Sequence, residues 1–397
     1  MSTVHLPRDG DAFVPYPFAK VRHARHGPLA GLRFAVKDVF DVRGYPTGAG
    51  NPELTAEAPA ATTTATAVQC LLDAGAEFCG KTVTDEFAFS LDGRHAALGA
   101  PLNPAAPDRL AGGSSSGSAS AVASGAVDFA LASDTAGSTR LPACQCGVYG
   151  LRSSYGRASV DGMQPLAPTF DACGWLGRDI GTLERVCAVA LGQTDGQSPL
   201  PALLSFDEAW HACAPVDDPT RHAAALLAQR RGGCHRLTLP GDQVARATDH
   251  FMAVLGHEAA CSVAVLAGRV RRPLDSLTAS RLAWARGITP DRARVATRAL
   301  KDFRDHWMSL TGTNSVVMLP TVPTGGPRRG ATERELRERR KAVLPWLCIA
   351  AVVGCPQLSI PVGSLDGVPR GLSLLGPVGS EVQLLAMARL LEASGKP

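Results

Sequence analysis

Residues 112–142 read GGSSSGSASAVASGAVDFALASDTAGSTRLP, and this stretch decides the fold. It holds two small-residue motifs, GGSSSGSAS at 112–120 and DTAGSTRLP at 134–142. The first opens an Ala-rich helix, and the second follows an apolar strand predicted over 127–132. Gly/Ser runs are often linkers, but a linker lies between domains. The second motif instead falls at the carboxyl end of a strand, where α/β sheets place their sites.

The flanking sequence continues this alternation of strands and helices. Apolar strands are predicted over 32–36, 315–319, 358–362 and 371–375, with helices over 61–74 and 381–392. A Gly/Pro/Ser-containing break at 192–201 precedes a helix-rich, Arg-rich segment that runs to about residue 310. The pattern predicts an α/β sheet. We expect the middle segment to be an insertion into this sheet, not a separate domain.

Composition excludes several classes of protein. The chain has 397 residues, of which 45% are hydrophobic and 19% charged, which is typical of a folded globular protein. Its net charge of +4 is matched by the excess of basic residues at 328–341, where Glu alternates with Arg at helical spacing. That run predicts a solvated helix. With aromatic residues at only 5%, we expect no nucleic-acid partner.

The same sequence bears on compartment and metal binding. No run approaches the roughly 18 apolar residues that span a membrane, and the N-terminus lacks an apolar core. We therefore expect a cytoplasmic protein with no membrane partner. Eleven cysteines, an odd number without regular spacing, argue against a disulfide framework. Cys144 and Cys146 form C-x-C and not C-x-x-C, so structural thiols are favoured over a metal site.

The loop after the 127–132 strand offers a nucleophile. Ser138 follows small residues whose backbone N–H groups can converge on one point, as an oxyanion hole requires. Gly113, Ser115 and Gly117 also satisfy G-x-S-x-G, but no strand precedes them as that motif needs. Ser138 is therefore the better candidate.

A base for that serine is harder to find among ten scattered histidines. Only six of the 40 basic residues are Lys, and Lys37 lies in the apolar segment FAVKDVF. Burial lowers the pKa of a lysine from about 10.4, and a value near 7 to 8 would suit a general base. Arginine stays protonated and could not serve. From this segment alone, a salt-bridged or snorkelling structural lysine is an equal alternative.

Three stretches taken together resemble the amidase signature family. They are FAVKDVFDVRGYPTGAGNP at 34–52, the segment from the first Ser/Gly motif to GRAS at 112–159, and GCPQLSIPVG at 354–363. The resemblance covers roughly residues 30–180 and 310–395 and is nearest to the plant-type indole-3-acetamide amidases. It implies one amidase domain over 1–397 with a central mixed β-sheet covered by helices on both faces. The signature core would span about 30–180, a variable helical substrate-side segment about 190–310, and the return to the sheet 311–397.

The family's catalytic residues carry over position by position. The resemblance implies Ser138 as the acyl nucleophile, Ser114 as a bridging serine after a cis peptide bond, and Lys37 as the base. No cofactor or metal is implied. Two positions depart from the commoner family pattern, since Ser116 and Ala136 stand where many members have Gly.

The same resemblance assigns roles around the nucleophile. The oxyanion hole would use the backbone N–H groups of Thr135, Ala136, Gly137 and Ser138. From its position two residues after the nucleophile, Arg140 could bind an anionic substrate, but a structural role with Asp134 as its partner is favoured. Lys81 is expected to serve packing or helix capping.

The implied function is hydrolysis of a small carboxamide, with an arylacetamide such as indole-3-acetamide favoured. Allophanate, urea or carbamate hydrolysis in the same family is an open alternative, because DTAGS is similar to the allophanate hydrolases. A glutaminase subunit of a tRNA amidotransferase is another, although such subunits are longer and need partner chains. A non-catalytic amidase-fold receptor is disfavoured by Lys37, Ser114 and Ser138. The expected partner is the small-molecule amide, with a homodimer left open.

Overall fold

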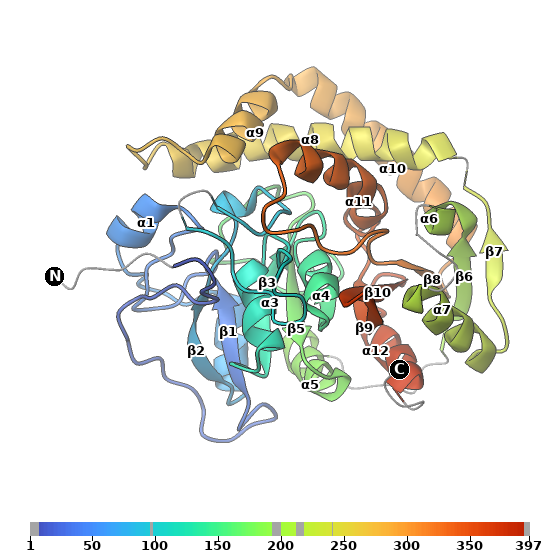
Figure 1. The fold of residues 1–397 in the computed structure, drawn as a ribbon, viewed down its shortest axis with the longest axis horizontal. Helices are drawn as coiled ribbons and strands as arrows, with labels where there is room; N and C mark the ends of the chain where they lie inside the picture. Colours follow the sequence, from blue (N-terminus) through green and yellow to red (C-terminus); the bar gives the residue numbers. More distant parts are fainter. Residues whose placement is uncertain (1–7, 96–97, 193–199, 212–217, 240, 393–397) are drawn as a thin grey trace.

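The structure is a computed structural model that describes residues 8–95, 98–192, 200–211, 218–239 and 241–392. In these residues, the centre of the molecule is a mixed ten-stranded sheet (Figure 1). The strand order is β2-β1-β3-β5-β4-β9-β10-β8-β6-β7. Parallel pairs form both ends of the sheet, and antiparallel pairs join them through its centre. In chain order the strands are β1 Arg33–Lys37, β2 Glu77–Thr82, β3 Phe129–Asp134, β4 Tyr149–Arg152, β5 Ala172–Gly177, β6 Ala202–Phe206, β7 His235–Leu237, β8 Ser315–Pro320, β9 Gln357–Leu365 and β10 Val368–Leu375.

Helices cover the sheet on both faces, as the resemblance implies. On one side α3 and α4 contact the central strands, while α5, α7 and α12 contact β5, β9 and β10. The long helices α8, α9 and α10 lie across one end of the strands (Figure 1). The helices of the described residues are α1 Pro52–Glu57, α2 Thr66–Asp73, α3 Ser116–Ala123, α4 Arg140–Cys146, α5 Ile180–Leu191, α6 Asp207–His211, α7 Pro219–Arg230, α8 Gly241–Ala267, α9 Ser276–Arg286, α10 Pro290–Thr311, α11 Glu333–Val353 and α12 Glu381–Glu392.

The centre of the sheet is fully buried. Every residue of β3 and of β5 is buried, which suits their run of small and apolar side chains without polar alternation. Phe34 of β1 stacks on Phe129 of β3 with ring centroids 5.3 Å apart. The parallel register pairs Val36 with Leu131, so the carboxyl ends of β1 and β3 lie side by side. The packed core therefore holds these two strand ends in a fixed relation.

Element boundaries differ from the prediction in two ways. The central strand runs two residues later than predicted, and the helix expected at 61–74 begins only at Thr66. The middle segment is less purely helical than we expected, because β6 joins the sheet beside β8 and β7 pairs with β6 at the edge. Both are short, with five and three residues, so their sequence carries little periodic signal. Part of the break predicted at 192–201 lies outside the described residues.

The basic run at 328–341 is not the fully solvated helix that we expected. Arg328 and Arg329 precede α11, which begins at Glu333 with a capping box between Thr332 and Glu335. Further along, Arg340 reaches Asp92 at 2.8 Å. Several of these cations thus face the protein, because α11 packs inward against the rest of the molecule.

Among the described residues, one helix meets the length and hydropathy expected of a membrane span, which our sequence analysis did not identify. Within α8, the segment Asp242–Ala267 has a mean hydropathy of 1.4, and 44% of its best window is buried. The helix packs against α9, α10 and α11. A core helix of a soluble protein meets the same criteria, so this finding is weak support for a membrane.

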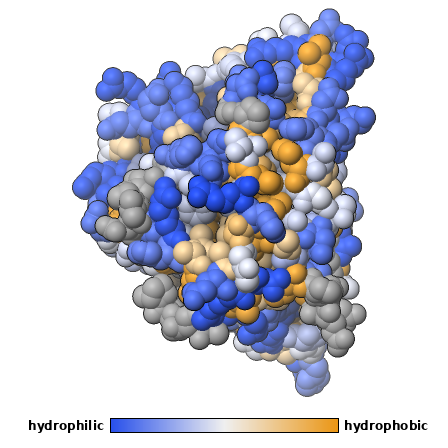
Figure 2. All heavy atoms as spheres, turned by 90° about the vertical axis from the view of Figure 1, so that its right-hand side faces the viewer, coloured by the Kyte–Doolittle hydropathy of each residue, from blue (hydrophilic) through white to orange (hydrophobic). Residues whose placement is uncertain are grey.

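The edge of the sheet at β7 is exposed and polar. His235 and Arg236 of this strand are exposed, and Arg236 pairs with Asp207 at 2.6 Å. From this side the surface is hydrophilic around an apolar band (Figure 2). Charged side chains on an edge strand oppose pairing with a strand of another molecule.

Candidate active site

Lys37, the last residue of β1, lies completely buried between two serine hydroxyls. Its Nζ donates to Ser114 Oγ at 2.7 Å and to Ser133 Oγ at 2.8 Å. Ser114 precedes α3, whereas Ser133 belongs to β3, the strand beside β1. Sequence reasoning missed Ser133 because the predicted strand stopped at residue 132. A longer strand, with its end set beside β1, would have indicated it.

Burial also changes the acid–base chemistry of this lysine. Removal from water lowers the pKa of Lys37 from 10.5 to about 7, against the opposing effect of Asp85, Asp134 and Asp171. A charged amine loses favourable hydration when buried, so its neutral form gains in population. Near pH 7 about half of the Lys37 side chains are therefore neutral and able to accept a proton.

The two serine motifs are joined through their backbones. Ser115 N donates to Ser138 O at 3.2 Å, and Ser114 O accepts from Asp85 N at the same distance. The peptide bond between Gly113 and Ser114 is cis, as the resemblance implies. Ser114 is fully buried and Ser138 is 3% exposed. The described residues show no hydrogen bond between the two Oγ atoms, so the side chains joined directly are Lys37 and Ser114.

Asp134, at the end of β3, organises the loop that carries Ser138. Its carboxylate accepts from Gly137 N at 2.9 Å and from Thr139 N at 3.0 Å. Arg140 pairs with the same carboxylate at 2.7 Å, which confirms the structural pairing predicted for it. Burial would raise the pKa of Asp134, but the guanidinium groups of Arg140 and Arg152 hold that pKa well below its usual range. The backbone of the loop is thus hydrogen-bonded to a carboxylate that stays ionised at ordinary pH.

The Asp134 carboxylate decides which amides of the loop are available. The N–H of Gly137 is already used by Asp134. Among the described residues, the N–H groups of Thr135, Ala136 and Ser138 donate to no protein acceptor. Gly137 has a φ of +118°, and a Cβ there would lie 3.0 Å from Leu347 Cδ1. A side chain at this position would therefore strain the loop, and the three uncommitted amides are free for a ligand oxygen.

Lys81 has a structural place beside this site. Its Nζ forms a buried ion pair with Asp38 Oδ1 at 2.8 Å and donates to Pro46 O at 2.7 Å. Tyr16 donates its hydroxyl to the other oxygen of Asp38 at 2.9 Å. The lysine thus binds the loop after β1 and serves packing, whereas helix capping, the other expected role, is not what it does. Burial lowers the pKa of Lys81, while Asp38 opposes that effect.

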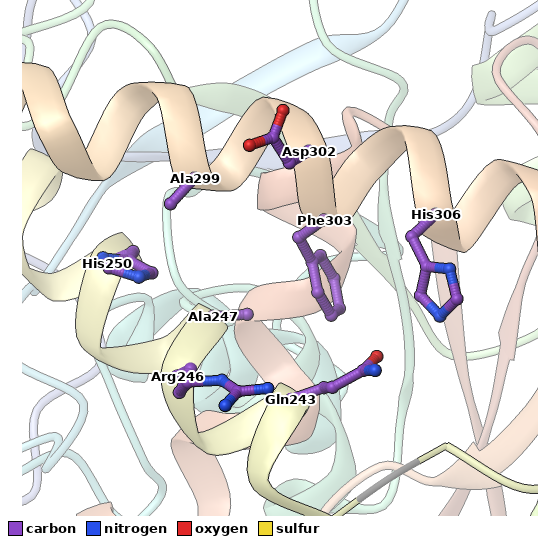
Figure 3. Close-up of a pocket in the computed structure, with 8 residues that line it drawn as sticks. All are labelled: Gln243, Arg246, Ala247, His250, Ala299, Asp302, Phe303 and His306. Atoms are coloured by element: carbon purple, nitrogen blue, oxygen red, sulfur yellow. The ribbon is translucent and has the colours of Figure 1, made fainter.

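A separate groove of about 260 Å³ lies between α8 and α10 (Figure 3). Its lining includes His250 from α8, and Asp302 and His306 from α10. The two histidines lie apart in Figure 3, so their rings do not converge on one point. In the described part of the chain, no three His, Cys, Asp or Glu side chains cluster as metal ligands would. This groove draws on neither Lys37 nor the serine motifs.

Comparison with known proteins identifies the family. A family model described as Amidase matches residues 18–221. Amidase 1 of Arabidopsis thaliana is 36% identical, over 92% of this chain and 93% of that protein. Outer envelope protein 64, chloroplastic, of the same plant is 33% identical, over 90% of this chain and 65% of that protein. A crystal structure of an amidase superimposes with a TM-score of 0.83 at 29% identity, covering 93% of this chain and 86% of that one.

The chain therefore belongs to the amidase signature family, with the α/β fold of that family. It is a hydrolase that acts on amide C–N bonds.

Proposed function

We propose that this amidase hydrolyses a small carboxamide through an acyl-enzyme, with Ser138 as nucleophile, Ser114 as bridging serine and Lys37 as base. One observation carries the proposal: Lys37 Nζ lies 2.7 Å from Ser114 Oγ in a site where burial lowers the pKa of the amine to about 7. A base is most effective when its pKa is near the working pH.

Acylation uses the triad as a proton relay. Neutral Lys37 takes the proton of Ser114, and Ser114 takes that of Ser138 as its Oγ bonds to the carbonyl carbon. The N–H groups of Thr135, Ala136 and Ser138 donate to the developing oxyanion. The C–N bond then breaks while a proton returns from Lys37 through Ser114 to the leaving nitrogen.

Deacylation runs through the same groups in the same order. Lys37, neutral again, removes a proton from water through Ser114, and the hydroxide oxygen bonds to the acyl carbon. The bond to Ser138 Oγ breaks, and its oxygen regains the proton from the relay. The products are a carboxylic acid and ammonia or an amine, and the enzyme returns to its initial protonation state.

An arylacetamide such as indole-3-acetamide is the favoured substrate. The similarity to plant Amidase 1 supports this choice. Hydrolysis of arylacetamides, aliphatic amides, ureas, carbamates and esters, compared as kcat/KM, tests this substrate class. A higher kcat/KM for ureas or carbamates than for arylacetamides would replace it with the alternative class.

The nucleophile is tested by covalent labelling. A fluorophosphonate should add one adduct to the wild-type protein and none to Ser138→Ala, as measured by intact mass. Ser124→Ala is the matched control, because Ser124 is exposed at the end of α3 and should leave labelling unchanged. An adduct that persists in Ser138→Ala would exclude Ser138 as the nucleophile.

We also infer one amidase domain over residues 1–397, a cytoplasmic location, and no nucleic-acid or membrane partner. The single sheet supports the first inference, since its strands come from the core, the middle segment and the C-terminal segment. The chloroplast envelope relative and α8 make location the point to test first. Fractionation of cells that express the tagged chain would decide it, and recovery in the membrane pellet would contradict a cytoplasmic location.

A further inference from the structure

A cavity of about 630 Å³ lies between α11 and the segment 324–331 that leads into it. The charged side chains that line it are three arginines and two acids: Arg328, Arg329, Arg339, Asp108 and Glu335. None of these residues belongs to the Lys37 site. We call this cavity the arginine pocket.

The acids of the pocket are committed to other partners. Asp108 accepts from Arg328 at 3.1 Å, and Glu335 accepts from the Thr332 backbone N–H at 2.7 Å in the capping box. Arg329 pairs with Asp9 at 2.5 Å. Two of the three arginines, Arg328 and Arg329, therefore form ion pairs with carboxylates, and Arg339 does not.

Arg339 has no carboxylate in direct contact within the described part of the chain, although Asp92 acts on its charge at longer range. Among the described residues no carboxylate lies within 4.0 Å of it, although the next residue, Arg340, pairs with Asp92 at 2.8 Å. Its Nε makes one long hydrogen bond of 3.4 Å to Gly325 O, and its Nη2 is buried without any acceptor. Burial lowers the pKa of Arg339 to about 10, so the guanidinium stays charged at neutral pH. A half-buried cation with one long hydrogen bond, an unsatisfied Nη2 and no carboxylate in contact is costly to the folded state.

A second arginine reaches the same glycine. Arg370 of β10 donates through Nε to Asp218 at 3.0 Å, but its Nη1 is buried and has no acceptor. A Cβ placed on Gly325 would lie 2.5 Å from that Nη1. The peptide at Gly325 thus has an unsatisfied guanidinium nitrogen from each of two arginines close by.

A third polar side chain without partners lies next to them. Both amide atoms of Gln145 are buried and make no hydrogen bond. Its Oε1 is 3.4 Å from the point where a Cβ on Gly326 would stand. Most buried polar groups in native proteins have a partner, so three such groups around two adjacent glycines call for an explanation.

We propose that the arginine pocket binds a small oxyanion, a carboxylate or a phosphate, through Arg339, and that Arg370 and Gln145, which lie outside its lining at the Gly325–Gly326 peptide, extend the site as further donors. Guanidinium groups bind the oxygens of both kinds of anion with charge-assisted hydrogen bonds, and Gln145 Nε2 is a further donor. A Cβ on Gly325 would lie 2.3 Å from Val368 Cγ1 and 2.5 Å from Arg370 Nη1, so only glycine lets these side chains approach the peptide so closely. The site is independent of the proposed hydrolysis, because it uses none of the triad residues.

Titration calorimetry of the full chain tests the proposal, with inorganic phosphate and succinate as separate probes at constant ionic strength. Wild type should bind at least one probe, and which one it prefers distinguishes the phosphate from the carboxylate source. Arg339→Gln should weaken binding by about tenfold or more, because a hydrogen bond to a charged group is lost. Arg334→Gln is the matched control: this arginine is exposed on the same helix and does not line the cavity, so binding should change by less than about threefold.

Further variants separate a binding defect from misfolding and from binding at the triad. Arg339→Lys keeps the charge but loses the forked guanidinium, and it should bind with intermediate affinity. Ser138→Ala should bind both probes as wild type does. The proposal is overturned if neither probe binds wild type up to about 10 mM, which corresponds to very weak affinity. It is also overturned if folded Arg339→Gln and Arg339→Lys both bind with the wild-type constant, or if Ser138→Ala abolishes binding.

Discussion

Replacement of Lys37 by arginine is the sharpest test of the proposed mechanism. Arginine keeps a cation of similar length at the end of β1 but cannot release its proton at ordinary pH. Burial lowers the pKa of Lys37 from 10.5 to about 7, a difference equivalent to about 5 kcal/mol between its two protonation states. Because of this lowered pKa, the lysine can act as a neutral base near pH 7. An arginine at this position would stay protonated and could not accept a proton.

The expected magnitudes follow from this pKa. In wild type, kcat/KM should level off above pH 7 and fall about tenfold per pH unit below it, to about one hundredth at pH 5. Lys37→Arg should lower kcat/KM by about 10²- to 10⁴-fold and remove the inflection. Lys301→Arg is the control, because Lys301 is exposed on α10 and should leave the profile unchanged.

The assay is release of ammonia from an arylacetamide between pH 5 and 8, with the fold of each variant checked by circular dichroism. Two results would refute the reasoning about Lys37. One is a wild-type profile that is flat over this range, and the other is an inflection near pH 7 that survives in Lys37→Arg.

Stability offers an independent view of the same group. Between pH 7 and 10.5 the unfolded chain holds a proton on Lys37 that the folded chain has released, given the folded pKa of about 7. The contribution of Lys37 to the free energy of unfolding therefore rises with pH through this window and is least favourable below pH 7.

Two further substitutions test the surroundings of the base. Asp134→Asn leaves two buried arginines without their shared carboxylate. Urea denaturation should therefore show the free energy of unfolding lowered by about 3–5 kcal/mol. A loss below about 1 kcal/mol would contradict the proposal that Asp134 anchors the nucleophile loop. Ser133→Ala removes one of the two hydrogen bonds from Lys37 Nζ. It should lower kcat/KM by about two- to tenfold and leave stability nearly unchanged. An unaltered kcat/KM would show that this hydrogen bond does not position the base.

The sequence was most informative at positions where the proposed chemistry can be performed by only a few residue types. A lone lysine among apolar residues and a serine after a strand of small residues both pointed to the site, and Lys37 is buried against Ser114. The Arg140 pairing was also predictable, since Asp134 lies only six residues away. These inferences required only local spacing and the known chemistry of the side chains.

Contacts between distant segments could not be predicted in this way. Asp85 bonds to the backbone of Ser114, and Arg339 reaches Gly325 O, through packing that no local pattern encodes. The short strands β6 and β7 were missed because three to five residues show no period, and β8, which pairs with β6, lies about one hundred residues further along the chain. The availability of individual amides in the nucleophile loop likewise depends on which of them the Asp134 carboxylate accepts.

Arg140 links the nucleophile loop to a part of the chain synthesised much later. Its Nη1 donates to Leu347 O at 2.8 Å and to Gln357 Oε1 at 2.6 Å, more than 200 residues beyond Ser138. A growing polypeptide has made Lys37 and both serines long before these acceptors leave the ribosome. The nascent chain should therefore remain inactive until its last strands have emerged, and no shorter N-terminal fragment should hydrolyse amides while its synthesis continues.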